Sequence, residues 1–258
     1  MPGRPRRGDR PSPGTAAPAE RRPLKTLERV LSKAGVGSRT EARQWIHAGR
    51  VSVNGRTTEN PDQWVDLERD RVRLDGRPLE TRASVYVLLY KPTGYLTTYK
   101  DPDGRPTVYG LLDDLGTFVS PVGRLDLDTS GLLLLTNDTQ LAERVTNPAS
   151  HVPKTYLVKA NRRLTDAELQ RLREGVELSD GPTRPAAVTR VRDSGKYTHF
   201  EIVLTEGRNR QVRRMVEALE ARVLKLVRIG IGDLRIGTLP IGRWRALSAD
   251  EVAALQRA

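Results

Sequence analysis

Residues 123–138, with the sequence GRLDLDTSGLLLLTND, place charged side chains directly before an uninterrupted apolar run. Four successive leucines bounded by turn-forming residues are typical of a strand that is buried on both faces. Folding alone gives no reason to place an arginine and two aspartates at the entrance to such a strand. The stretch therefore predicts a buried strand whose approach segment takes part in chemistry.

The two aspartates of this segment, Asp126 and Asp128, allow three interpretations. In extended chain they point to one side, and Leu125 and Leu127 point to the other. They can belong to an ordinary turn, or they can divide acid and base roles as in glycoside hydrolysis. Neighbouring carboxylates tend to share a proton, which weakens that second interpretation. In the third interpretation, one carboxylate is a nucleophile.

The composition favours a polyanionic partner. The chain has 44 Lys and Arg against 32 Asp and Glu, a net charge of +12, and no cysteine. No apolar run approaches the roughly 18–20 residues that span a bilayer, so no membrane partner is expected. The lack of cysteine excludes RNA methylation through a cysteine adduct and deamination at a Cys-ligated zinc. It is compatible with the cytosol, and we expect a cytoplasmic protein.

The N-terminal part divides into an arm and a small module. Residues 1–23 hold six Pro and six Arg without apolar periodicity, which predicts a disordered basic arm. From residue 24, apolar residues at helical spacing predict a helix that ends at Gly35, and residues 38–41 (SRTE) form a capping box that begins a second helix. A basic stripe runs beside the apolar face of that second helix and consists of Arg39, Arg43, His47 and Arg50. The stripe can bind RNA, or it can serve solubility alone.

The remaining chain, residues 83–258, is rich in strand signals. Helices are expected to begin at Thr165, after Gly207 and at Ser248. Many strands with few intervening helices favour an α+β domain on a mixed or antiparallel sheet. No glycine-rich nucleotide-binding fingerprint is present and the three histidines are scattered, so neither a nucleotide cofactor nor a metal is expected. The expected strands cover residues 85–90, 118–122, 132–136, 155–160, 186–192, 198–204 and 223–229.

Two further motifs carry candidate functional residues. Residues 206–215, EGRNRQVRRM, predict a helix starting near Asn209 with four arginines at its beginning, suited to phosphate or simply solvated. At about 100° per residue, Arg210 points away from the apolar face, while Arg213 lies at its boundary, where a guanidinium can be half buried against a carboxylate. In residues 154–158, KTYLV, Tyr156 is by itself typical of sheet packing.

In this order, the motifs resemble those of the ribosomal-RNA pseudouridine synthases that carry an N-terminal S4 domain. The resemblance rests on SRTEA and GRVSVNG in the module, and on KPTG, GRLD, KTY and GRNRQVRR after it. It implies a small α/β S4 RNA-binding module over residues 24–82, followed over residues 83–258 by a catalytic domain with a mixed or antiparallel sheet. It covers nearly the whole chain from residue 24 onward.

The resemblance also implies roles. Asp126 would attack a uridine taken out of the RNA stack, Tyr156 would stack against its base, and Arg213 would keep Asp126 charged and placed. Asp128 would order the loop, and no cofactor or metal would be needed. Contacts to RNA would come from Arg39, Arg43, Arg50, Lys91, Arg124, Arg208 and Arg210.

The expected partner is ribosomal RNA or an assembling pre-ribosomal particle, and a monomer is the default expectation. Residues 121–138, PVGRLDLDTSGLLLLTND, resemble the large-subunit branch of the family more than the small-subunit branch. Two alternatives stay open. One is a non-catalytic S4-type protein that binds ribosomal RNA during ribosome assembly, and the other is an RNA-directed glycosidase.

Overall fold

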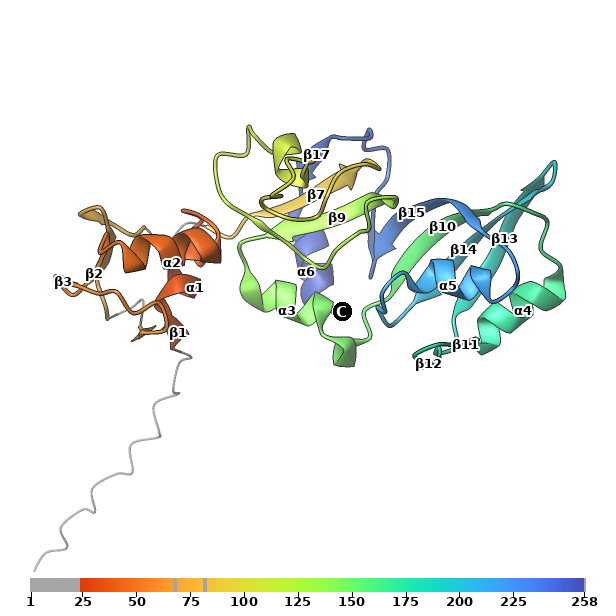
Figure 1. The fold of residues 1–258 in the computed structure, drawn as a ribbon, viewed down its shortest axis with the longest axis horizontal. Helices are drawn as coiled ribbons and strands as arrows, with labels where there is room; N and C mark the ends of the chain where they lie inside the picture. The colour runs from red at the N-terminus through yellow and green to blue at the C-terminus, as the bar shows by residue number, and fades with distance from the viewer. Residues whose placement is uncertain (1–23, 67–68, 81–82, 258) are drawn as a thin grey trace, which may run out of the picture.

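The computed structural model describes residues 24–66, 69–80 and 83–257. The basic arm expected at residues 1–23 lies outside these residues. Figure 1 shows a small module at one end of the molecule, followed by a larger sheet that carries helices along its length. The α+β class and the order of the two parts are as predicted.

The N-terminal module packs two helices, α1 (Leu27–Lys33) and α2 (Arg39–His47), against short strands. The capping box is confirmed, because Ser38 Oγ accepts from the Glu41 amide and Glu41 accepts from the Ser38 amide. The first helix begins later than the spacing predicts, because β1 pairs with β4 and draws the preceding residues into a strand. The strands are β1 (Lys25–Thr26), β2 (Val51–Val53), β3 (Arg56–Thr57), β4 (Trp64–Val65), β5 (Val72–Leu74) and β6 (Arg77–Pro78).

The larger part is built on a nine-stranded sheet whose main order is β13-β14-β10-β15-β9-β7-β17. All seven expected strands are present, although the one expected at 118–122 is reduced to β8. The sheet is mixed, because β15 and β9 run parallel while the other named strand pairs are antiparallel. Its strands are β7 (Tyr86–Lys91), β8 (Ser120–Pro121), β9 (Ser130–Thr136), β10 (Lys154–Ala160), β13 (Ala187–Ser194), β14 (Tyr197–Leu204), β15 (Val223–Ile231), β16 (Leu234–Arg235) and β17 (Trp244–Ala246).

Three of the helices in this part were expected, α4 (Asp166–Glu174), α5 (Gln211–Glu217) and α6 (Ala249–Arg257). A fourth, α3 (Thr139–Thr146), was not, although Asp138 caps it by accepting from the amides of Gln140 and Leu141. The smaller elements are the 3₁₀ turns η1 (Val108–Leu111) and η2 (Pro148–Ser150) and the hairpin of β11 (Glu177–Leu178) and β12 (Gly181–Pro182).

The leucine strand β9 is buried on both faces, as predicted. Leu132 and Leu134 pack into the cluster that contains residues of α3 and α6, and Leu133 and Leu135 pack into the cluster around η1. None of the four side chains is exposed. At about 1.5–3 kcal/mol for each buried leucine, this strand is a major source of stability and a rigid base for the segment before it.

The second residue of β9, Gly131, lies against the backbone of Arg228 in the parallel neighbour β15. Its φ is +113°, and a Cβ at this position would lie 2.3 Å from the Arg228 carbonyl oxygen and 2.5 Å from its amide nitrogen. A non-glycine residue therefore cannot occupy this position without separating the strands. The parallel contact between β9 and β15 depends on this glycine.

The module also contacts the larger part. The Tyr99 hydroxyl donates to Glu41 Oε1 at 3.0 Å, and the Phe118 amide donates to the Gly35 carbonyl at 3.2 Å. Glu41 therefore caps α2 and anchors the module at once. Among the described residues, no helix combines the length and apolar character needed to cross a membrane.

We predict that Gly131→Ala destabilises the protein strongly. The added methyl group overlaps backbone atoms, so the free energy of unfolding should fall by about 3 kcal/mol or more. Gly181→Ala is the matched control, because its φ of +97° is similarly unfavourable but no atom lies within 4 Å of the added Cβ. It should cost only about 1–2 kcal/mol. Chemical denaturation measures both, and equal losses would contradict the close-approach explanation.

Candidate active site

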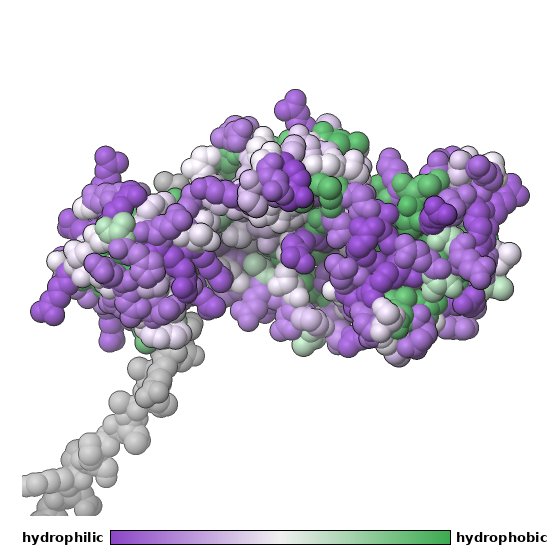
Figure 2. Space-filling model, viewed as in Figure 1, coloured by the Kyte–Doolittle hydropathy of each residue, from purple (hydrophilic) through white to green (hydrophobic). Residues whose placement is uncertain are grey.

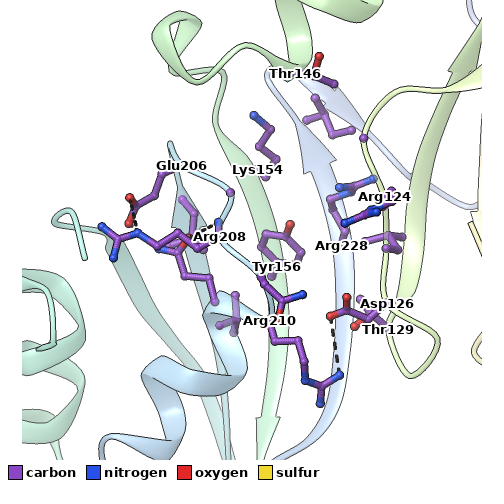
Figure 3. A pocket seen from close by; sticks show the side chains of 18 of the residues that line it. Arg124, Asp126, Thr129, Thr146, Lys154, Tyr156, Glu206, Arg208, Arg210 and Arg228 are labelled. Carbon is purple, nitrogen blue, oxygen red and sulfur yellow. Dashed lines mark hydrogen bonds and ion pairs between the residues drawn. The ribbon is translucent and has the colours of Figure 1, made fainter. Parts of the chain in front are cut away.

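A cavity of about 300 Å³ lies where the segment before β9 meets β10, β15 and the segment before α5 (Figure 3). Asp126 and Tyr156 both line it, although they are 30 positions apart in the chain. The volume is at the lower end of the range for small-ligand pockets. The charged and aromatic side chains in its lining are Arg124, Asp126, Lys154, Tyr156, Glu206, Arg208, Arg210 and Arg228.

The approach segment is a turn and not an extended chain. The Thr129 amide donates to the Asp126 carbonyl at 3.1 Å, which reverses the chain direction before β9. Leu125 is buried but Leu127 is 44% exposed, so the expectation that these leucines share a side is wrong. The turn gives the two aspartates different surroundings: Asp126 lines the cavity, and Asp128 lies outside the lining.

Lys91, the last residue of β7, stabilises this turn from the protein interior. Its ammonium donates to the carbonyls of Thr129 at 2.8 Å, Asp126 at 3.0 Å and Pro92 at 3.0 Å. Three acceptors match the three hydrogens of an ammonium group. Burial lowers the pKa of Lys91 to about 8, against the opposing effect of the Asp126 and Asp128 charges, so the group is mainly cationic at neutral pH.

The expectation that Lys91 contacts RNA is wrong for this structure. The side chain is completely buried, and it is occupied by backbone carbonyls. The sequence KPTG indicated a turn but gave no sign that the lysine points inward. The structure makes Lys91 a residue that positions the Asp126 turn.

The arginines of the 206–215 segment are arranged differently from the helical-wheel expectation. Arg213 lies 3.1 Å from Asp128 Oδ2 and donates to the Asp128 carbonyl at 3.0 Å, so the expected pair with Asp126 is not formed. Arg210 donates to both carboxylate oxygens of Asp128 and lies 3.9 Å from Asp126 Oδ2. The arginine that reaches Asp126 is therefore Arg210.

The reason lies in the backbone of Arg210. This residue has a φ of +47° and forms the N-cap of α5, so the helix begins only at Gln211. A wheel of about 100° per residue applies from the first helical residue onward and does not describe the direction of a left-handed cap. Arg213 is within the helix and is buried at the boundary, as expected, but it meets a neighbouring carboxylate.

Asp128 joins the turn to α5. Burial alone would raise the pKa of its carboxyl, but the hydrogen bonds from Arg210 and the charge of Arg213 outweigh burial and lower it. Asp128 is therefore ionised well below neutral pH and binds two arginines at once. These contacts fix the distance between the turn and α5. Asp126, in the same turn, lines the cavity.

Tyr156 both packs within the sheet and lines the cavity. It lies on β10 between Ile202 of β14 and Arg228 of β15, and its half-buried side chain packs against two of the apolar clusters. It also lines the cavity, in the centre of the view in Figure 3. Packing on both sides restrains an aromatic ring that remains accessible from the cavity.

The other predicted RNA contacts fall into two groups. Arg208 is held by the carbonyls of Gly181 at 2.8 Å and Pro182 at 2.6 Å and by Glu206 at 3.3 Å, so it supports the wall of the cavity. Arg124 is exposed and lines the cavity, and no described residue provides it with a hydrogen bond or ion pair.

The predicted basic stripe lies on the module. Arg39 is exposed, Arg43 pairs with Glu28 and with Asp62, and Arg50 pairs with Asp75 through two hydrogen bonds of 2.9 and 2.6 Å. Arg50 follows the end of α2 and does not belong to the helical face. The face shown in Figure 2 is mainly hydrophilic over this module.

Two cationic residues of the cavity were missed by the sequence analysis, Lys154 and Arg228. Lys154 belongs to the KTY motif, but only the tyrosine was weighed. Arg228 lies near the end of the strand expected at residues 223–229, where nothing in the local pattern marks it as facing a cavity. Among the described residues, no group of three or more His, Asp or Glu side chains is arranged to hold a metal ion.

Comparison with known proteins agrees with this geometry. Residues 85–218 match the family described as RNA pseudouridylate synthase, and residues 26–72 match the S4 domain. An uncharacterized RNA pseudouridine synthase of Aquifex aeolicus is 41% identical over 233 residues, which is 90% of this chain and 94% of that protein. The ribosomal large subunit pseudouridine synthase B of Escherichia coli K12 is 40% identical over 228 residues, which is 86% of this chain and 78% of that protein. A pseudouridylate synthase crystal structure, 30% identical, aligns with a TM-score of 0.65 over 90% of this chain and 99% of that one.

We predict a pH-dependent contribution of Asp128 to stability. Because its pKa is lowered in the folded protein, its contribution should be complete above the unfolded value of 3.8 and should disappear as the pH falls through the folded value. The free energy of unfolding of wild type should exceed that of Asp128→Asn by about 1 kcal/mol at pH 6, since the carboxylate is half exposed. Denaturant titrations from pH 6 to pH 3 measure the difference. A difference independent of pH would contradict the assignment, and Arg210→Gln should reduce it.

Proposed function

The chain belongs to the RNA pseudouridylate synthase family, and from this premise we propose that it converts a uridine of large-subunit ribosomal RNA to pseudouridine with Asp126 as the nucleophile. The observation that carries the proposal is the shared cavity: it brings the carboxylate of Asp126 and the ring of Tyr156 into one space of nucleoside size. The preference for large-subunit RNA rests on the name of the relative from Escherichia coli K12 and on the sequence of residues 121–138.

The proposed reaction begins with a uridine that leaves the RNA stack, because a cavity of about 300 Å³ accepts one nucleoside and not a helix. The Asp126 carboxylate attacks C1′ of the ribose, and the bond from C1′ to N1 breaks with its electron pair leaving on the base. The base rotates, C5 forms a bond to C1′, and Asp126 is released. The C5 proton is lost and N1 gains a proton, so product and substrate have the same composition.

Tyr156 is proposed to hold the base through this rotation. An aromatic face is the usual receptor for a base taken out of a stack, and it allows rotation because stacking has little directional preference within the ring plane. The packing of Tyr156 between neighbouring strands keeps the ring in place while the base turns. Help with proton transfer is a further role that its hydroxyl is able to perform.

The two arginines receive different roles. Arg210 places a positive charge 3.9 Å from Oδ2 of the proposed nucleophile, Asp126. Arg213 does not reach Asp126 and contacts the carbonyl and carboxylate of Asp128 instead. We therefore propose Asp126 and Tyr156 as catalytic residues and Arg213 as a positioning residue. This assignment replaces the direct pairing of Arg213 with Asp126.

The module is proposed to supply much of the affinity for RNA. Its own apolar core includes residues from Leu27 to Leu79, while the cores of the larger part begin at Val85, which supports domains at residues 24–82 and 83–258. Arg39, free of an ion pair among the described residues, can contact a phosphate directly. Arg43 and Arg50 must exchange carboxylate partners to do so. Such contacts weaken as salt increases.

The test is to treat unmodified large-subunit ribosomal RNA with wild type and with Asp126→Asn, and to map pseudouridine at single-nucleotide resolution. We expect one modified uridine with wild type and a loss of about a thousandfold or more in rate with the variant. RNA affinity should be unchanged. Asp128→Asn is the matched comparison: it weakens the contacts of the same turn with Arg210 and Arg213 but keeps the nucleophile, so its loss in rate should be much smaller.

Three results would contradict the proposal, in whole or in part. RNA binding by wild type without any pseudouridine would indicate a non-catalytic binding protein. Abasic sites in place of pseudouridine would indicate a glycosidase. Full activity of Asp126→Asn would leave the reaction in place but assign the nucleophile elsewhere.

A further inference from the structure

We propose that Lys154, Arg228 and Arg124 form a binding site for one phosphate group of the RNA backbone next to the target uridine. The inference rests on the proposed function and adds to it a contact that fixes the position of the nucleotide in the cavity. The three residues come from β10, β15 and the segment before β9, and all three line the cavity that contains Asp126 and Tyr156 (Figure 3).

The buried arginine of this group has hydrogen-bonding capacity that the protein does not use. Arg228 is only 4% exposed, and its Nε donates to the Leu132 carbonyl at 2.7 Å. Its Nη2 is buried and has no hydrogen-bond partner. A guanidinium has five N–H donors, and leaving such a donor buried and unpaired is costly. Because Arg228 lines the cavity, a ligand bound there can supply the acceptor that this guanidinium lacks.

Lys154 adds a second charge with free donors. Its ammonium donates to the Val145 carbonyl at 3.3 Å, which leaves two of its three hydrogens available. Burial lowers the pKa of Lys154, and the positive charge of Arg228 lowers it further. Two like charges at a partly buried site repel, and an anion between them removes the repulsion.

The group differs from the other arginines of the site in having no carboxylate partner. Arg208, Arg210 and Arg213 each lie within 4 Å of an aspartate or glutamate oxygen. Within residues 24–66, 69–80 and 83–257, no carboxylate forms an ion pair with Lys154, Arg228 or Arg124. Arg208, Arg210 and Arg213 are therefore neutralised by carboxylates of the protein. Lys154, Arg228 and Arg124 leave a net positive charge at the cavity.

The position of the group indicates a phosphate of the RNA. Arg228 lies opposite Tyr156 in the pairing of β15 with β10, and Lys154 precedes Tyr156 by two residues on the same strand. A base on the Tyr156 ring therefore has these cations within the span of one nucleotide. Phosphate oxygens accept charge-assisted hydrogen bonds from both guanidinium and ammonium groups. Holding this phosphate fixes the ribose, and with it the distance from C1′ to Asp126.

The first test measures binding and does not require turnover. The dissociation constant of oligouridylate is measured between 50 and 300 mM KCl for wild type, Lys154→Met and Lys159→Met. Lys159 is the control because it belongs to β10 but does not line the cavity, its ammonium lying over the Tyr197 ring. Loss of one phosphate contact should reduce the slope of log K against log salt by about 0.7 for Lys154→Met. An unchanged slope for Lys154→Met, or an equal reduction for Lys159→Met, would overturn the proposal.

The second test locates the phosphate. An RNA fragment carrying the mapped uridine is prepared with a neutral methylphosphonate on its 5′ or its 3′ side and bound to Asp126→Asn, with and without Lys154→Met. At one of the two positions, the lost charge should weaken binding about tenfold in the first protein and should have no further effect in the second. If the methylphosphonate weakened binding by the same factor with and without Lys154→Met at both positions, the proposal would be overturned.

Arg228→Met is expected to disturb folding through the lost bond to Leu132, so Arg124→Met, at an exposed position, provides the second variant for both tests. It should show the same reduction in salt dependence. Failure of the proposed function is recognised separately: wild type would then form no pseudouridine, while the salt dependence of oligouridylate binding would still report on the phosphate site. An altered slope with no pseudouridine would support the phosphate site alone.

Discussion

The candidate active site depends on one buried ammonium group. Lys91 donates three hydrogen bonds to the backbone carbonyls of Pro92, Asp126 and Thr129, and two of these acceptors belong to the turn that carries the Asp126 carboxylate. Hydrogen bonds to a charged group contribute about 1.5–3 kcal/mol each, far more than a typical turn residue gains from its local sequence. Lys91 is the last residue of β7, and the turn leads directly into β9. Because these two core strands are paired, they determine the position of the Asp126 carboxylate.

A second constraint brings the other half of the site to this turn. The two parts of the sheet meet where β9 and β15 pair in parallel over Val227↔Ser130 and Arg228↔Gly131. The glycine allows this close approach, and β10, which carries Tyr156, is the next strand along. Figure 1 shows β9 and β15 at this junction, and residues from both sides of it line the cavity. A change at the junction therefore moves the tyrosine relative to the aspartate.

Local sequence patterns predicted the features that depend only on neighbouring residues. The leucine strand, the capping box at Ser38 and the strands of the sheet follow from periodicity and turn residues. The direction of Arg210 was not predictable in this way, because a left-handed cap removes it from the helical wheel. The burial of Lys91 and the inward position of Arg228 arise from contacts between strands that are distant in the chain. Residue roles were predicted mainly through the family resemblance.

Lys91 is expected to place the carboxylate that performs the proposed reaction. The most direct measurement is the single-turnover rate constant of pseudouridine formation by Lys91→Met at saturating enzyme, together with its RNA affinity and its melting transition. Because a displacement of about 1 Å can cost about a hundredfold in rate, we expect Lys91→Met to lose about that much, with RNA affinity within about twofold of wild type. A normal rate constant with RNA affinity weakened about tenfold would contradict it, because the lysine would then be a contact to RNA.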